Sequence, residues 1–129
     1  MNFLEGTIEI EGEGVYFNEG QIKVLAPKAF EAKLRPHAGK KVFFGVRPED
    51  MYVMGYGEPV KEGISKIKSK VEIVEPMGSE IYAYMTTGKT PYIARLDAHV
   101  PLQLDEVKDL AIDMNKSHFF DMATENAII

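Results

Sequence analysis

The chain has 129 residues, a formal net charge of −5 and no cysteine. This length suits one domain or two small intertwined lobes with a sizeable core, and the lack of cysteine excludes disulfides and thiolate metal sites and fits a reducing compartment. The acidic balance argues against general binding to the nucleic-acid backbone, which depends on clustered lysine and arginine.

In the first half of the chain, apolar residues alternate with polar ones in short runs that glycine-containing turns separate. A period of two is that of a half-buried strand. The predicted strands cover residues 4–11, 15–17, 21–25 and 41–47. The last should lie centrally in its sheet, because both of its faces carry apolar side chains. Before it, Pro27 opens a helical turn that Pro36 keeps short.

Residues 54–63 are rich in glycine and indicate an exposed connection, after which a second series of strands begins. The predicted strands cover residues 67–73, 81–85, 92–96 and 109–115. The middle two are expected to form a hairpin around a turn-rich connection. The run of Lys61, Lys66, Lys68 and Lys70 could meet an acidic partner, but lysines with a period of two are typical of a protected edge strand, which is favoured.

Two short sequence similarities indicate that the halves are related. Residues 7–10 match residues 70–73, and residues 32–37 match residues 94–99 at nearly the same offset. We therefore expect a duplicated β unit, with pseudo-repeated lobes near residues 1–62 and 63–129 that pair rather than stack.

Three motifs carry a resemblance to a known family. They are residues 45–51 (GVRPEDM), 71–80 (VEIVEPMGSE) and 117–124 (SHFFDMAT). Together they resemble the C-terminal regulatory domain of the ATP-binding subunits of maltose- and sugar-type ABC importers. The resemblance covers nearly the whole chain. It implies an all-β fold, an oligonucleotide-binding-like (TOBE) barrel or sandwich of two related lobes with short helical turns.

The resemblance also implies one accessory regulatory and dimerisation domain over residues 1–129, separated from an N-terminal ATPase domain. The sequence has no Gly-x-x-x-x-Gly-Lys-Ser/Thr phosphate loop, so this chain alone should not hydrolyse ATP. No cofactor is expected in it, and ATP and Mg²⁺ are expected only in the missing ATPase domain.

The partners that the resemblance implies are the ATPase domain of the same polypeptide, a second copy of the subunit, the membrane subunits of the transporter and, in some members, a regulatory protein. No nucleic-acid partner is expected. No apolar run approaches the roughly 20 residues of a membrane helix, and no basic leader of a signal peptide opens the sequence. The expected location is therefore the cytoplasm, at the inner face of the membrane through the transporter complex.

The candidate interaction residues at the end of the 41–47 strand are Gly45, Arg47, Pro48, Glu49 and Asp50. In one interpretation Arg47 and Glu49 project from the strand end and meet another protein surface, because arginine makes directional pairs at interfaces. In the other, Arg47 neutralises a nearby carboxylate while Pro48 shapes the turn. The second is favoured, since surface ion pairs are common.

A second candidate site consists of Gly78, Ser79 and Glu80. Glycine-rich turns can aim backbone N–H groups at an oxyanion, but the carboxylate of Glu80 would repel one. A tight turn between strands is therefore favoured. The alternative function to be tested is a freestanding module that binds an oxyanion or a sugar at this turn or between the lobes.

The last candidates are His118, Phe120 and Asp121, which in the resemblance belong to the final core-facing element. There His118 is expected to anchor that element. His37, His99 and His118 are too far apart in sequence for a local metal motif, so we expect no metal site and no catalytic residue.

Overall fold

The structure of the protein is a computed structural model that describes residues 1–56 and 62–129. The first half contains β1 (Asn2–Glu11), β2 (Gly14–Asn18), β3 (Lys23–Leu25), α1 (Lys28–Leu34), η1 (Arg35–His37), β4 (Lys41–Val46), η2 (Pro48–Asp50) and β5 (Met51–Tyr52). The second half contains β6 (Ile64–Pro76), β7 (Glu80–Thr86), β8 (Pro91–Asp97), β9 (Val107–Asp113), η3 (Met114–Lys116) and β10 (His118–Asp121). The predicted all-β class with short helical turns is confirmed.

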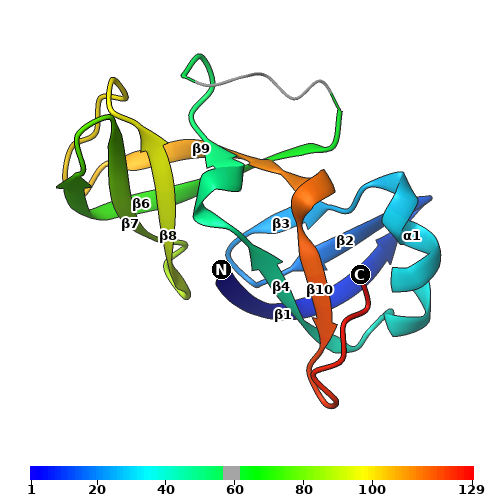
Figure 1. Cartoon of the computed structure of the whole chain (residues 1–129). Helices are drawn as coiled ribbons and strands as arrows, with labels where there is room; N and C mark the ends of the chain where they lie inside the picture. The colour runs from blue at the N-terminus through cyan, green and yellow to red at the C-terminus, as the bar shows by residue number, and fades with distance from the viewer. Residues whose placement is uncertain (57–61) are drawn as a thin grey trace.

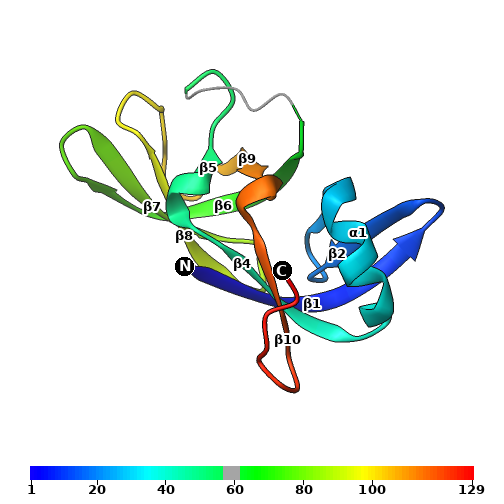
Figure 2. The same cartoon turned by 45° about the vertical axis from the view of Figure 1, so that its right-hand side comes forward.

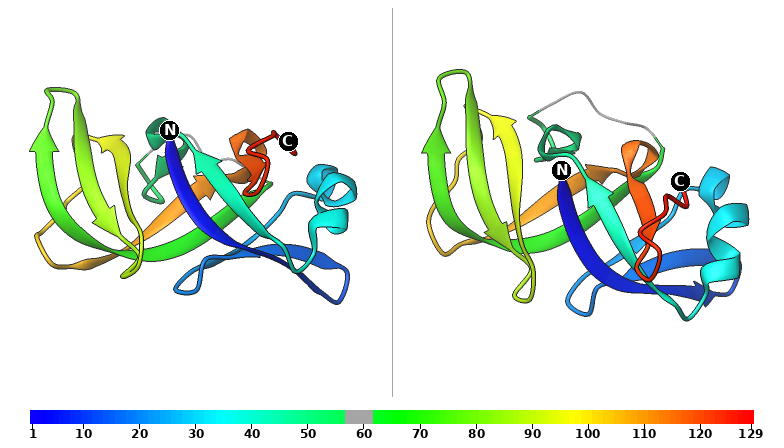
Figure 3. Two further views of the ribbon diagram at one scale, coloured as in Figure 1. Left: turned by 90° about the horizontal axis from the view of Figure 1, so that it is seen from below. Right: turned by 60° about the horizontal axis from the view of Figure 1, so that its bottom comes forward.

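The strands form two five-stranded antiparallel sheets, which lie side by side as two curved lobes (Figure 1). The first sheet has the order β10-β4-β1-β2-β3, and the second has the order β5-β9-β6-β7-β8. Four strands of each sheet therefore follow the same path, with β6 to β9 repeating β1 to β4. Figure 3 shows the two lobes from two further directions.

The fifth strand of each sheet comes from the other half of the chain. β5 pairs with β9, and β10 pairs with β4, so the two halves exchange a strand. In Figure 2, β10 leaves the second lobe and runs along the first. The sheets therefore do not follow a division at residues 62 and 63, although the repeat of strand order agrees with a duplicated unit.

The core of the first lobe is aromatic. Phe17, Phe44 and Phe119 are fully buried, and their ring centroids lie 5.2 to 6.1 Å apart. α1 covers this cluster with Leu34, which is buried, and Phe30, which is partly buried. Because Phe119 belongs to β10, the exchanged strand supplies a central part of this core.

In the second lobe, β6 is buried on one side through Ile67 and Val71, which supports the predicted alternation. The prediction that its lysines protect an edge strand is wrong, because β6 pairs with β7 on one side and with β9 on the other. Lys66, Lys68 and Lys70 instead cover the solvent face of a central strand.

The match between residues 32–37 and residues 94–99 does not reflect a structural repeat. Residues 32–37 lie in α1 and η1, whereas residues 94–97 lie in β8 and pair along β7. Local sequence similarity cannot outweigh the presence or absence of a strand partner. Part of the predicted connection, residues 57–61, lies outside the described residues. Among the residues that are described, no helix has the length and apolarity needed to cross a bilayer.

Candidate interaction surface

The motif turn begins where β4 ends at Val46. Arg47 has an extended backbone, and Pro48 opens η2, as the sequence predicts. The backbone N–H of Asp50 donates to the carbonyl oxygen of Arg47 at 3.0 Å, which closes the turn. Proline suits this first position because its fixed φ matches the helix and its missing N–H has no helical partner there.

The favoured ion pair of Arg47 is not formed with any carboxylate of the described residues. Asp50 is only 7% exposed and faces Lys116 of η3 instead, with 3.9 Å between Oδ1 and Nζ. Burial raises the pKa of Asp50. The positive charge of Lys116 opposes this rise, whereas the negative charges of Glu49 and Asp113 add to it. The pair joins the two turns at which the chain halves exchange strands.

The turn over residues 78–80 is a strand connection in the structure. Gly78 has φ +81°, a backbone shape that other residues resist, and the N–H of Met77 donates to the carbonyl oxygen of Glu80 at 2.8 Å. Arg95 donates to both carboxylate oxygens of Glu80, at 2.6 and 2.9 Å, and lowers the pKa of Glu80. These contacts favour the turn interpretation over an anion site.

β10 brings the last group of candidates next to the first. His118 lies opposite Gly45 in the β10–β4 register. Its Nδ1 lies 3.4 Å from the carbonyl oxygen of Ile129, so it contacts the final residues. Asp121 Oδ1 accepts hydrogen bonds from two backbone N–H groups of the following turn, and its Oδ2 lies 3.6 Å from His37 Nδ1. Asp121 and His118 thus hold the two ends of β10. The structure brings this group next to the turn after β4, whereas the 78–80 turn belongs to the second sheet.

The outer face of the first sheet is apolar where β10, β4 and β1 lie side by side. Phe3, Phe43 and Phe120 line a cavity of about 410 Å³ there together with Glu125, and we call this cavity the outer groove. The rings of Phe3 and Phe120 meet edge to face with centroids 5.8 Å apart. Phe3 remains 55% exposed. Exposed aromatic side chains that gather in this way commonly mark an interaction site.

Gly45 of β4 lies beneath the side chains that surround the outer groove. A Cβ atom at this position would lie 2.7 Å from Met1 Sδ and 3.3 Å from Phe120 Cε2. The missing side chain therefore lets Met1, Phe3 and Phe120 gather over β4. This gives the motif glycine a packing role that its sequence context does not reveal.

A second cavity of about 590 Å³ adjoins the outer groove through Phe3 and extends over the second lobe. We call it the adjoining cavity; its lining includes Glu72, Ile73, Tyr84, Pro91 and Ile93. The two cavities together form an apolar surface that crosses from one lobe to the other.

Polar contacts fix the two lobes to each other next to these cavities. The amide of Asn2 donates to the carbonyl oxygen of Ile93 at 2.7 Å and accepts from its N–H at 3.0 Å, so this side chain imitates a strand partner of β8. In the turn between β2 and β3, Glu19 is only 1% exposed. Its carboxylate accepts from Thr87 Oγ1 at 2.6 Å, and Lys89 Nζ donates to its carbonyl oxygen at 2.9 Å.

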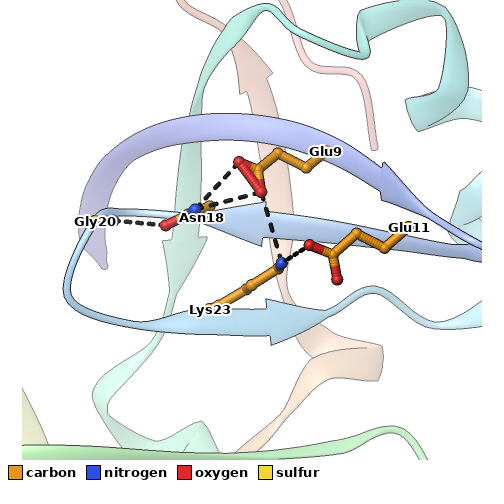
Figure 4. A network of polar contacts seen from close by, with 5 residues as sticks. All are labelled: Glu9, Glu11, Asn18, Gly20 and Lys23. Atoms are coloured by element: carbon orange, nitrogen blue, oxygen red, sulfur yellow. Dashed lines mark hydrogen bonds and ion pairs between the residues drawn. The ribbon is translucent and has the colours of Figure 1, made fainter.

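Figure 4 shows the network that braces the turn carrying Glu19. The side chain of Asn18 donates to Glu9 at 3.1 Å and accepts from the N–H of Gly20 at 2.8 Å, while Lys23 pairs with Glu9 and Glu11. Sequence reasoning missed Glu19, because a glutamate between an asparagine and a glycine looks like an exposed turn residue. We call the contacts of Asn2 with Ile93 and of Glu19 with Thr87 and Lys89 the joint between the lobes. A polar cleft of about 330 Å³ lies beside the Glu19 part of this joint. In the described part of the chain, no three His, Asp or Glu side chains gather as a metal site.

Comparison with known proteins finds similarity to one family of transport proteins. Residues 1–51 match the family described as the MalK OB fold domain. Over 97% of its length the chain is 38% identical to the oligosaccharides import ATP-binding protein MsmX of Bacillus subtilis. The resemblance predicted from the sequence is confirmed. Sugar-import ATP-binding proteins share this region, but the chain spans only about a third of the length of these curated relatives.

Two further relatives agree with this family. The trehalose/maltose import ATP-binding protein MalK of Thermococcus litoralis is 33% identical over 99% of the chain, which spans 34% of that protein. The multiple sugar-binding transport ATP-binding protein MsmK of Streptococcus mutans is 32% identical over 99% of the chain, which spans 33% of that protein. Among solved structures, the cytoplasmic molybdate-binding protein ModG has the same fold, with a TM-score of 0.66 and 17% identity over 92% of this chain and 94% of that one.

Proposed function

We propose that this chain is the accessory regulatory and dimerisation domain of the ATP-binding subunit of an ABC importer for sugars or related solutes. The 38% identity over 97% of the chain to an oligosaccharide-import ATP-binding protein carries this proposal. The chain has no phosphate-loop motif, so ATP binding and hydrolysis fall to the part of the subunit that it does not match.

In this function the domain acts by keeping two subunits together. A lasting contact between two regulatory domains would hold the attached ATPase domains at a high effective concentration, so that their closure is intramolecular. The joint at Asn2 and Glu19 supports such a role, because it ties both lobes into one unit that can transmit a contact. The membrane subunits of the importer would place this assembly at the inner face of the membrane.

The experiment compares the complete subunit with a version that lacks this domain. Sedimentation should show weaker dimerisation without the domain, while nucleotide binding to the phosphate loop persists. An unchanged dimer affinity would contradict the proposal. The coding sequence upstream of Met1 provides an independent check, since a phosphate loop and an ABC signature are expected there.

A freestanding ligand-binding module is the second candidate function. It is supported by the shared fold with a protein whose structure holds molybdate. The polar cleft beside Glu19 suits a sugar better than an oxyanion, because Glu5 and Glu9 also line it. A thermal-shift panel of molybdate, sulfate and sugars separates the two candidates, because a ligand that binds the native state raises the Tm. A rise that saturates with ligand would favour the module, and a flat response favours the regulatory domain.

A further inference from the structure

We propose that the outer groove is the docking site for an apolar segment, flanked by basic residues, from the ATP-binding part of the same polypeptide. This inference rests on the proposed function and deepens it by naming the surface that joins the domain to its ATPase.

The first argument is that the fold itself does not need this face to be apolar. Phe44 and Phe119 already fill the inner face of the same strands, and both are fully buried. The opposite face of an antiparallel sheet is normally solvated and polar. Here the outer face carries Phe3, Phe43 and Phe120 on three adjacent strands, so these side chains are available for contact with a further partner.

The second argument is the shape of the groove. Gly45 lets Phe3 and Phe120 approach each other over β4, and the adjoining cavity continues the groove across Phe3 to Tyr84 and Ile93 of the second lobe. An extended or helical segment can therefore contact both lobes along one line. Such a contact fixes the orientation of the domain better than a contact with one lobe alone.

The third argument concerns charge. Glu125 is the charged side chain of the outer groove, and Glu72 is that of the adjoining cavity, while no lysine or arginine of the described residues lines either one. A segment with Lys or Arg on both sides of its apolar residues complements this arrangement. A second copy of the same face would leave both carboxylates without a cationic partner, which argues against self-association through this face.

The fourth argument is proximity. The curated relatives are about three times as long as this chain, and Met1 itself borders both Gly45 and the adjoining cavity. Residues joined in front of Met1 would therefore start at the groove. A segment tethered there has a high effective concentration and docks without a strong intrinsic affinity.

The test uses the full polypeptide that the gene encodes and measures amide hydrogen exchange. The double substitution Phe3→Ser and Phe120→Ser should lower the protection of a segment preceding Met1 at least tenfold. The matched control is Leu104→Ser with Val107→Ser, two side chains that are 63% and 65% exposed but line neither cavity. The control should leave that protection unchanged. Amides of β2 and β4, which belong to the core, report whether each variant is folded.

Glu125→Lys provides a second variant that does not touch the aromatic residues. It should lower the same protection about threefold at low salt and less at high salt, because it places a cation where the groove has a carboxylate. Equal protection in wild type, the aromatic double variant and Glu125→Lys would overturn the docking inference and leave the proposed function intact. A gene without an ATPase domain upstream of Met1 would overturn both.

Discussion

The outer faces of the two sheets differ although the strands beneath them follow the same order. Over β4 and β10 the first sheet presents phenylalanine, whereas over the part of β6 that pairs with β9 the second presents lysines, two of which pair with acids. Lys68 lies 3.9 Å from Asp109, and Lys70 lies 3.5 Å from Asp105. The inner faces of both sheets are apolar because each must bury a core. The outer faces are not constrained by folding, so their difference points to interaction rather than stability.

The largest effect on stability is expected on the inner side of β10, and the outer side of the same strand provides the comparison. Phe119→Ala removes a fully buried ring that contacts Phe17 and Phe44, and it should lower the free energy of unfolding by about 3–5 kcal/mol. Phe120→Ala on the outer face should cost roughly 1 kcal/mol, because that ring is only partly buried. Urea unfolding of the 129-residue protein measures both. Similar losses would mean that the outer face contributes to the core.

Alanine substitutions at two glycines compare the tolerance of the inner and the outer face of the first sheet to an added methyl group. A Cβ atom at Gly6 would lie 2.5 Å from the backbone oxygen of Asn18 and 2.6 Å from Phe17 Cζ, so Gly6→Ala should destabilise by about 1–3 kcal/mol. Gly45→Ala should cost less than about 1 kcal/mol, because the nearest atom is the sulfur at the flexible end of Met1. Thermal unfolding of both variants checks the order. A larger loss for Gly45→Ala would show that the outer groove is rigid.

The joint between the sheets should respond to acid. Burial alone would raise the pKa of Glu19, but hydrogen bonds from Thr87, Thr90 and the N–H of Gln21, with the charge of Lys89, together lower it below 4.5. The ionised carboxylate therefore stabilises the fold above the unfolded-state pKa, and this contribution is lost as the pH falls through the folded-state pKa.

Glu19→Gln should cost about 1–2 kcal/mol at pH 7, since it weakens hydrogen bonds to a buried charge. The difference from wild type should shrink as the pH falls below 4.5, and urea unfolding across that range measures it. A constant difference at every pH would show that the charge of Glu19 does not hold the joint.

The smallest effect is expected on the lysine-covered face of the second sheet. Lys68→Ser removes an exposed pair with Asp109 and should change the free energy of unfolding by no more than about 0.5 kcal/mol. Urea unfolding at low and high salt is the measurement. A clear loss that persists in high salt would mean that this face supports the sheet through packing, and the contrast between the two faces would weaken.

Much of the fold could be predicted from the sequence because local patterns determine it. Alternation marked most of the strands, and Pro48 correctly indicated the turn after β4. The apolar residues on both faces of the 41–47 strand, Phe43 among them, predicted a central strand, and β4 does lie between β10 and β1. These signals depend on neighbours in sequence, which is why they can be recognised without coordinates.

The parts that could not be predicted depend on distant pairing. β5 and β10 each leave their own half, and no local pattern states which strand a short segment will join. The same holds for Asn2, whose side chain meets the backbone of Ile93, and for Glu19, which is buried only because the β7–β8 turn lies against it. The lysines of β6 were assigned to an edge because period-two charge looks the same on any solvent face.

The exchange of β10 has a consequence for how the protein is made. A chain emerging from the ribosome would hold β1 to β4 long before the segment that carries Phe119 appears. Until then, the rings of Phe17 and Phe44 lack their third aromatic neighbour. Completion of the first lobe therefore waits until β6 to β9 of the second lobe have been translated, which couples its maturation to that of the second lobe.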